Sequence, residues 1–498
     1  MTAQTILPAN TLSSGFDVDN SCRFDNPASG QSEGGTADDT LIRTPDAASN
    51  RRTFTISLWM KRTLLQAAAP AGGSTLQQVI GQQASGYFRL TLGSNEQGDI
   101  LRFYGGDGFE FRSKIFVRDV SAWYHIVLAM DTTQGTAANR AKLYVNGVQQ
   151  TEFYTANYPN QNVEQAWNVA AAHRIASGTN AGGSYSGYLC EVVNIDGAAL
   201  APTSFGEFDE DSGIWKPIDV SELTFGTNGF HLDFKNSSEL GTDVSGNGNT
   251  FAETGLTAIN QTTDTCTNNF CTMNPLANFV TAATISDGAL TTNFANGRGS
   301  CTSTFGLTTG KWYVEMNITT MPKDERFGFG ISPFETKAED LPHEANNQGL
   351  DLSGYNAVIY ANLDGGSSVI NTFFGNNTTR FDSFTGIIGM ALDLTSATKT
   401  IAFSKAGEWV TGGGTSDTDF SNALKVDIST AFARHQFWHI ANGTGNGDGT
   451  NGIFSMNFGS PAFAISSSNA DGNGFGNFEY AVPSGYLALC TKNLGSNG

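Results

Sequence analysis

The sequence predicts an all-β protein built from two antiparallel β-sandwich (jelly-roll) domains. Only 15% of its 498 residues are charged and 58 are glycine, a composition typical of short strands joined by tight turns. Apolar residues alternate with polar ones over segments of strand length, and no periodic helices lie between these segments. Aromatic residues make up 11% of the chain, including 35 phenylalanines, which is enough to fill two cores.

The expected strands of the first sandwich alternate as half-buried strands do. Asn146-Gly147 inside one of them is a strong signal for a type I′ hairpin turn. The segments are 55–61 (TISLWMK), 123–131 (WYHIVLAMD), 141–149 (AKLYVNGVQ) and 188–195 (YLCEVVNI).

The motifs ISLWMKR, WYHIVLAMD, LYVNGV and SGYLCEVVNIDGAAL, in this order, resemble a laminin-G-like domain of the concanavalin A type. The resemblance covers residues 14–233 and implies a jelly roll of two packed sheets, which we assign to residues 1–235. Residues 236–277 are rich in Gly, Thr and Asn, and we expect an ordered connector there because Phe251, Leu256 and Phe270 need cover.

The second sandwich is expected over residues 278–498. Its most informative stretch is 386–409, where two alternating segments flank the polar turn 395–399 as a β-hairpin. The motifs GKWYVE, FGFGIS and IIGMALDL…IAFSKAGEW, followed by FWHIA, GIFSMNFG and PSGYLAL, resemble a SPRY domain. That resemblance implies recognition of proteins or peptides through loops, here 334–352, 371–382, 411–419 and 442–452.

The whole arrangement is similar to virion structural proteins of tailed, notably marine, bacteriophages. The similarity rests on FGEFDEDSGIWKP, the DVSGNGN connector motif and the ending GYLALCTKNL, and it spans nearly the whole chain. It implies a head-fibre, tail-fibre or decoration protein that is made in the host cytoplasm and located in the virion. Other virion proteins, a host-surface glycan or protein, and further copies of the chain are the implied partners, with trimers the common fibre arrangement.

Charge argues against other partners. The formal net charge of −20 repels phosphate backbones and anionic membrane surfaces, so we expect neither nucleic-acid binding nor membrane insertion. No apolar run reaches the length of a membrane span, and the first residues do not read as a secretory signal. Six cysteines are too few for a disulfide framework, which predicts buried thiols.

Catalytic motifs give little support to an enzyme. Glu207, Asp209 and Asp211 resemble the E-x-D-x-E strand of laminarinase-like glycosidases, but the third residue is aspartate and the surroundings read as a loop. No Gly-x-Ser-x-Gly, His-Glu-x-x-His or phosphate-binding loop occurs. We therefore expect a non-enzymatic protein, with an envelope-polysaccharide hydrolase or lyase and a purely structural capsid or tail component as the alternatives.

No cofactor is required, although calcium is a candidate. Oxygen-bearing side chains with the spacing of a calcium loop occur at Asn446, Asp448 and Thr450, although Asn457 stands where such a loop has a bidentate glutamate. Asp243, Ser245 and Asn247 have similar spacing. Hairpin turns use the same residue types, so these segments could equally be turns that bind no metal.

Exposed aromatic residues are the candidates for ligand contact. Trp167 lies in the loop-like NVEQAWNVAA, and Phe373, Phe374 and Arg380 lie in a second polar, glycine-containing segment. An aromatic ring at a loop tip is costly in water unless a sugar ring, a receptor or a neighbouring subunit covers it.

Overall fold

The structure is a computed structural model that divides the chain into two compact units, Met1–Asn269 and Phe270–Gly498. In the described part, α-helix is confined to α2 (Ser429–Phe432) and α3 (Thr491–Asn497), so the expected all-β class is confirmed. The described residues are 15–25, 39–65, 76–82, 86–93, 97–177, 183–280, 283–295, 299–320, 327–332, 357–361, 384–411, 415–433, 437–444 and 451–497.

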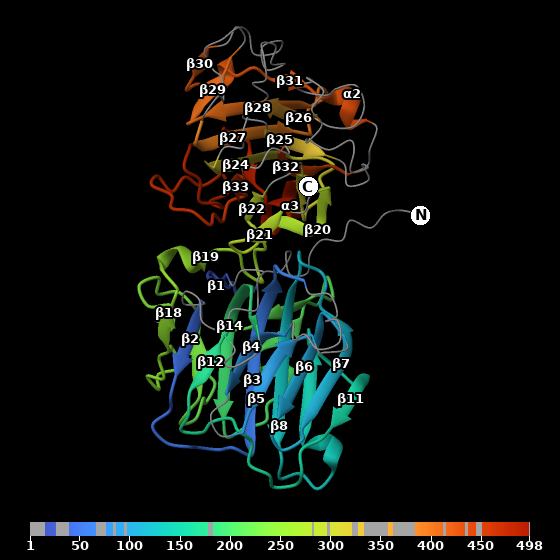
Figure 1. The fold of residues 1–498 in the computed structure, drawn as a ribbon, viewed down its shortest axis with the longest axis vertical. Coiled ribbons are helices and arrows are strands. Elements are labelled where there is room, and N and C mark those ends of the chain that lie inside the picture. Colours follow the sequence, from blue (N-terminus) through green and yellow to red (C-terminus); the bar gives the residue numbers. More distant parts are fainter. Residues whose placement is uncertain are drawn as a thin grey trace. The chain divides into compact units, whose positions relative to one another are not determined.

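The first unit contains an antiparallel eight-stranded sheet in the order β10-β9-β8-β3-β14-β1-β19, with β17 paired to β14 (Figure 1). Its strands are β1 (Ser21–Phe24), β3 (Thr53–Arg62), β8 (Trp123–Asp131), β9 (Ala141–Val145), β10 (Val148–Gln149), β14 (Gly187–Asp196), β17 (Phe230–Leu232) and β19 (Gln261–Thr262). The turn between β9 and β10 places Asn146 at φ 47° and Gly147 at φ 77°, as the predicted type I′ turn requires.

The second sheet of this unit has nine strands in the order β11-β7-β6-β5-β4-β12-β2-β18, with β13 paired to β4. All of these pairs are antiparallel except β13 with β4. Its strands are β2 (Thr40–Arg43), β4 (Gln77–Gln82), β5 (Phe88–Leu92), β6 (Ile100–Gly105), β7 (Glu110–Phe116), β11 (Phe153–Asn157), β12 (His173–Ile175), β13 (Gly183–Ser184) and β18 (Ala252–Thr254).

A hydrophobic core between these two sheets makes the first unit a sandwich. Alternate side chains of β3, namely Phe54, Ile56 and Leu58, are buried in one cluster with Phe88 and Phe103 of the nine-stranded sheet. The Phe54 and Phe88 rings meet edge to face with centroids 5.5 Å apart. The strand alternation seen in the sequence therefore has its cause in the packing of one sheet face against the other.

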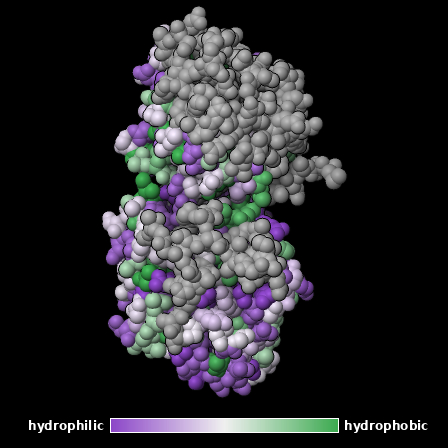
Figure 2. Space-filling view, viewed as in Figure 1, coloured by the Kyte–Doolittle hydropathy of each residue, from purple (hydrophilic) through white to green (hydrophobic). Residues whose placement is uncertain are grey.

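The other face of the eight-stranded sheet is also covered. After η2 (Pro202–Ser204), a small hairpin of β15 (Gly206–Phe208) and β16 (Trp215–Pro217) brings Trp215 into a cluster with Trp59, Trp123 and Tyr188. Figure 2 shows hydrophilic residues over much of the visible described surface of this unit, with hydrophobic residues in small groups among them.

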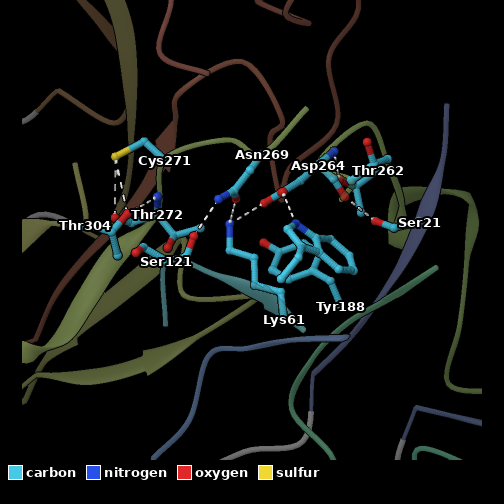
Figure 3. Close-up of polar contacts among 12 residues, drawn as sticks. Ser21, Lys61, Ser121, Tyr188, Thr262, Asp264, Asn269, Cys271, Thr272 and Thr304 are labelled. Atoms are coloured by element: carbon cyan, nitrogen blue, oxygen red, sulfur yellow. Dashed lines mark hydrogen bonds and ion pairs between the residues drawn. The ribbon is translucent and has the colours of Figure 1, made fainter. Parts of the chain in front are cut away.

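A buried ion pair holds the last segment of the first unit on this covered face (Figure 3). The Lys61 ammonium lies 2.8 Å from Asp264 Oδ2 and donates to Asn269 Oδ1 over 2.6 Å. Trp123 Nε1 donates to the second oxygen of Asp264 over 3.2 Å. Both charged side chains are at most 1% exposed, so each depends on the other for its stability in the interior.

Most of the segment expected as a connector belongs to the first unit. β18 pairs with β2 at one end of the nine-stranded sheet, and β19 pairs with β1 at one end of the eight-stranded sheet. The boundary between the units therefore lies between Asn269 and Phe270, inside the predicted connector 236–277.

The second unit is also a sandwich of two antiparallel sheets. Its five-stranded sheet has the order β20-β23-β32-β25-β26. Its ten-stranded sheet has the order β21-β22-β33-β24-β27-β28-β29-β30. In this sheet β31 also pairs with β28, and β34 pairs with β24 in parallel. The strands are β20 (Met273–Val280), β21 (Thr284–Ser286), β22 (Thr291–Phe294), β23 (Gly299–Ser303), β24 (Lys311–Thr320), β25 (Phe327–Ser332), β26 (Ala357–Ala361), β27 (Gly386–Asp393), β28 (Thr400–Lys405), β29 (Glu408–Val410), β30 (Ser416–Asp417), β31 (Val426–Asp427), β32 (His439–Thr444), β33 (Gly452–Asn457) and β34 (Leu487–Ala488).

The core of the second unit again lies between its sheets. Phe329 of the five-stranded sheet meets Phe403 of the ten-stranded sheet with ring centroids 5.9 Å apart. β27 and β28 form the predicted hairpin of 386–409, pairing Asp393 with Thr400 next to the turn. Two sandwiches are thus confirmed.

Candidate functional site

The acidic motif of residues 207–211 lies on the β15–β16 hairpin and not in a cleft. Asp209 closes the turn, because its Oδ1 accepts hydrogen bonds from Ser212 N and Oγ and from Asp211 N. These backbone and hydroxyl donors, with the Lys216 ammonium, lower the pKa of Asp209 to about 2. Glu207 and Asp211 are exposed, and the Lys216 ammonium lies 3.4 Å from the Glu207 carboxylate. Of the three carboxylates, Asp209 therefore shapes the turn, whereas Glu207 lies in β15, although the segment was expected to be a loop.

A serine–histidine pair lies beneath the same hairpin. His125 Nε2 is 2.8 Å from Ser57 Oγ, and Trp215 Nε1 donates to His125 Nδ1 over 2.9 Å. Since Nδ1 accepts, Nε2 carries the proton and donates to the serine, so the ring cannot take the serine proton as a general base does. Burial lowers the pKa of His125 to about 3, which keeps the ring neutral. The hydrogen bond from Trp215 to His125 joins the hairpin to the sheet.

The prediction that Trp167 is exposed is wrong. Its side chain is fully buried, and its ring contacts Phe88 and His173 at centroid distances of 5.7 and 4.6 Å. Its indole N–H donates to Asn194 Oδ1 over 2.9 Å. The inward-facing amide of Asn194 on β14 accepts this hydrogen bond, which allows the indole to be buried in the core. Because the side chain is fully buried, no ring face is available for a sugar.

Asp243 organises the loop around residues 243–249. Its Oδ1 accepts from the amides of His231 and Ser245, and its Oδ2 accepts from Ser245 Oγ and the amide of Asn249. The side-chain amide of Asn247 donates to the carbonyls of Gly226 and Gly229. The structure thus brings both predicted residues into one loop, where hydrogen bonds within the chain already use the Asp243 carboxylate. Calcium binding at Asp243 and Asn247 stays a prediction.

The other predicted site residues lie outside the described residues. These are Phe373, Phe374 and Arg380 for ligand contact, and Asn446, Asp448 and Thr450 for calcium. Within the described ranges no three histidine, cysteine, aspartate or glutamate side chains converge as a metal site, and no helix is long and apolar enough to cross a membrane. All six cysteines are buried, as predicted.

The outer face of the nine-stranded sheet carries a set of arginines that the sequence analysis missed. Their neighbours along each strand, such as Phe88, Leu90, Phe103 and Phe111, point into the core, so the arginines point outward. Cross-strand pairing places them in two adjacent rows. One row is Glu110, Tyr104, Arg89, Gly81 and Arg174, and the other is Arg112, Arg102, Thr91 and Gln78; we call these residues the arginine face.

Positive charge is in excess on the arginine face. Arg102 and Arg112 both contact the Glu110 carboxylate, at 2.7 and 2.8 Å from its Oε1. Burial raises the pKa of Glu110, but hydrogen bonds from Arg112 and Arg102 outweigh it, and the net pKa is lowered. Neither Arg89 nor Arg174 has an ion pair with a described carboxylate, and burial lowers the pKa of Arg174. Glu110 is thus the one carboxylate within these two rows of described residues, beside four guanidinium groups, in a chain whose net charge is −20.

Tyrosine rings fix the arginine orientations. The guanidinium of Arg102 lies 3.9 Å from the centroid of the Tyr104 ring, and that of Arg89 lies 5.3 and 5.7 Å from the centroids of Tyr87 and Tyr104. Arg89 Nη1 also donates to the Tyr104 hydroxyl over 3.2 Å. Tyr87 is 39% exposed, so part of its ring is open to a ligand.

Buried polar atoms in the middle of the arginine face have no hydrogen-bond partner within the described residues. They are Gln78 Oε1, Thr91 Oγ1 and Arg89 Nε. Gln78 and Thr91 are opposite each other on β4 and β5, and each residue is 1% exposed. Each buried polar atom without a partner lowers the unfolding free energy by about 1–3 kcal/mol, so these three atoms destabilise the folded unit at this position.

The comparisons with known proteins support the fold. Residues 34–202 match the family described as the concanavalin A-like lectin/glucanases superfamily. The first unit has this lectin-like fold. No curated protein matches the chain.

Solved structures with similarity to the chain are distant. A heptameric SAP-like pentraxin from Limulus polyphemus is 15% identical, with a TM-score of 0.26, and the match covers 38% of this chain and 80% of the pentraxin. A putative carbohydrate-binding protein from Bacteroides ovatus is 16% identical, with a TM-score of 0.31, covering 49% of this chain and 60% of that one. The SPRY domain of human HERC1 is 14% identical, with a TM-score of 0.21, and the match covers 37% of this chain and 96% of that domain. These values are too low to transfer a ligand or an activity.

Proposed function

We propose that this protein is a non-enzymatic attachment protein of a bacteriophage virion whose first unit binds a carbohydrate on the host surface. The observation that carries the carbohydrate assignment is the arginine face, a polar and aromatic surface with unmet hydrogen-bonding groups on a concanavalin A-like sandwich. Side chains that donate in a fixed geometry next to an open tyrosine ring suit a ligand rich in hydroxyl groups. The sequence similarity to tailed-phage structural proteins supports the virion assignment and a head-fibre, tail-fibre or decoration role.

Several copies of the chain are expected to act together. Single saccharide sites bind weakly, and linking copies in one particle raises the effective affinity without new contacts. A homo-oligomer, with a trimer as the common fibre arrangement, therefore fits the proposed role. Calcium at the predicted loops would be a structural ligand in this proposal and no part of a reaction.

Binding of purified full-length protein to host cells and to an array of bacterial envelope polysaccharides tests the proposal. We expect saturable binding to at least one polysaccharide, and labelling of intact particles by antibodies against the protein. Surface labelling without binding to cells or polysaccharides would favour a purely structural role.

The enzyme alternative has its own assay. Reducing ends released from host polysaccharide would show hydrolase or lyase activity, and we expect none. If release occurs and disappears in Glu207→Ala or Asp209→Ala, the non-enzymatic assignment is wrong. The turn role of Asp209 makes Asp209→Asn a useful second variant, because it keeps the size of the side chain.

A further inference from the structure

We propose that the ligand of the arginine face is an acidic saccharide chain, whose carboxylate or sulfate groups pair with Arg89 and Arg174. This inference rests on the proposed function and adds the chemical class of the ligand. Three features carry it: guanidinium groups without a carboxylate partner among the described residues, the spacing of these groups across Gly81, and buried hydrogen-bonding groups without a described partner.

The first feature is unbalanced charge. Arg102 and Arg112 both contact Glu110, whereas Arg89 contacts Tyr87 and Tyr104, and neither Arg89 nor Arg174 has an ion pair within the described residues. A partly buried guanidinium that lacks a carboxylate is poorly solvated, so an arriving anion gains more there than at an exposed arginine. The planar fork of arginine matches carboxylate and sulfate oxygens in pairs.

The second feature is the shape of the row. Gly81 lies between Arg89 and Arg174 and pairs with both, so the two arginines are two strands apart, about 10 Å at the usual strand spacing. Gly81 has no side chain, and a Cβ at this position would lie 2.6 Å from Gln78 Nε2. The Gln78 amide thus fills the space above Gly81, between the positions of Arg89 and Arg174. An extended chain with anionic groups on successive or alternate sugar rings suits two guanidinium groups at this spacing.

The third feature is the set of unmet polar groups. Gln78 Nε2 donates to the Ser177 carbonyl over 2.7 Å, which fixes the amide and leaves Oε1 as an acceptor without a donor. Thr91 Oγ1, directly across, can both donate and accept. Sugar hydroxyls offer both functions on neighbouring carbons, so one ring can satisfy Gln78 and Thr91 together. Gln78 and Thr91 are each 1% exposed, so neighbouring side chains must change rotamer before a sugar hydroxyl can reach them.

Aromatic and charge patterns of this kind also occur in sites for single-stranded nucleic acid, which also stacks on aromatic rings beside arginines. The net charge of −20 opposes a long phosphate backbone, whereas a saccharide with spaced charges needs only the local patch. The observations therefore favour the acidic saccharide, and nucleic acid becomes an outcome of the test.

Calorimetric titration of the full-length protein tests this. The probes are polygalacturonate with its carboxyl-reduced form, dextran sulfate with dextran, and single-stranded DNA. We expect at least one acidic polymer to bind at least tenfold more tightly than its neutral partner, with affinity that falls as salt rises. The pair that responds tells carboxylate from sulfate.

The variants are Arg89→Gln, Arg174→Gln and the double variant, with Lys142→Gln as control. Lys142 is a partly exposed residue on β9 of the other sheet, so it removes one charge without touching the arginine face. Each arginine variant should lose about tenfold in affinity, and the control should keep wild-type affinity. Arg174→Gln should also unfold at an unchanged or higher urea concentration, because it removes an uncompensated charge, which separates lost binding from lost folding.

Three results would overturn the proposal: no binding of either acidic polymer, equal affinity for the neutral forms, or unchanged affinity in the double variant. Tighter binding of DNA than of any polysaccharide would replace the acidic saccharide with nucleic acid. Binding of neutral polysaccharides alone would leave the proposed carbohydrate function intact and reject the acidic class. Absence of binding to every polysaccharide, on the array as well, would reject both.

Discussion

Replacing Lys61 with methionine removes the ammonium group that Asp264 and Asn269 hold on the covered face of the first unit (Figure 3). Methionine fills a similar volume, so the substitution tests the charge more than the packing. The Asp264 carboxylate would then be a buried anion without its cation. Breaking such a pair from one side costs about 3–5 kcal/mol of unfolding free energy.

Pulsed hydrogen exchange at increasing urea concentration measures this cost in the full chain. Peptides from residues 15–269 report on the first unit, and peptides from residues 270–497 report on the second unit as an internal reference. The matched control is Lys114→Met, because Lys114 pairs with Glu152 over 3.1 Å with side chains 48% and 77% exposed. An exposed pair is worth at most about 1 kcal/mol.

The expected result is a large loss of stability in the first unit for Lys61→Met and a small one for Lys114→Met. The double variant Lys61→Met with Asp264→Asn should recover part of the loss, since no unpaired charge remains. If Lys61→Met costs no more than Lys114→Met, the buried pair does not fasten residues 262–269 to the sheet.

Two further predictions concern the first unit. Gly147→Ala should destabilise it by about 1–3 kcal/mol more than Gly108→Ala, measured by urea unfolding. Both glycines have positive φ, 77° and 87°, but a Cβ at 147 would lie 2.3 Å from the Trp215 ring, whereas one at 108 meets nothing within 4 Å; equal effects would contradict the role of that contact. Burial lowers the pKa of His173 to about 4. Between pH 6.5 and 4 only the unfolded state therefore takes up this proton, so the unfolding free energy decreases as the pH is lowered. We expect a decrease of about 2 kcal/mol from pH 7 to pH 5. A His173→Gln variant should lack this part of the pH dependence, and an unchanged slope would refute the assignment.

Strands with one buried face could be predicted from the sequence, because alternation is imposed by the core. The segment 123–131 is β8 with the same bounds, and 188–195 lies within β14. Segment 141–149 is divided into β9 and β10 by the turn that Asn146-Gly147 indicated.

The arginine face had a signal in the sequence that was not used. Arginine alternates with apolar residues in FRLTL (88–92), ILRFYG (100–105) and EFRSKIF (110–116). Each strand alone reads as an ordinary exposed face, and only the cross-strand register brings the arginines into adjacent rows. The prediction for Trp167 was wrong because its loop-like neighbours in the sequence do not indicate burial. Asn194, which accepts its N–H inside the core, is distant in the sequence.

The late strands β18 and β19 have a consequence for how the first unit is made. The ribosome adds β18 and β19, which pair with β2 and β1, and Asp264, which pairs with Lys61, after all other strands of the first unit. A fragment that stops at residue 235 would lack the strands that pair with β1 and β2 and the Asp264 carboxylate that pairs with Lys61. Exposed strand edges promote aggregation of β proteins. A fragment for expressing the first unit alone should therefore end at Asn269.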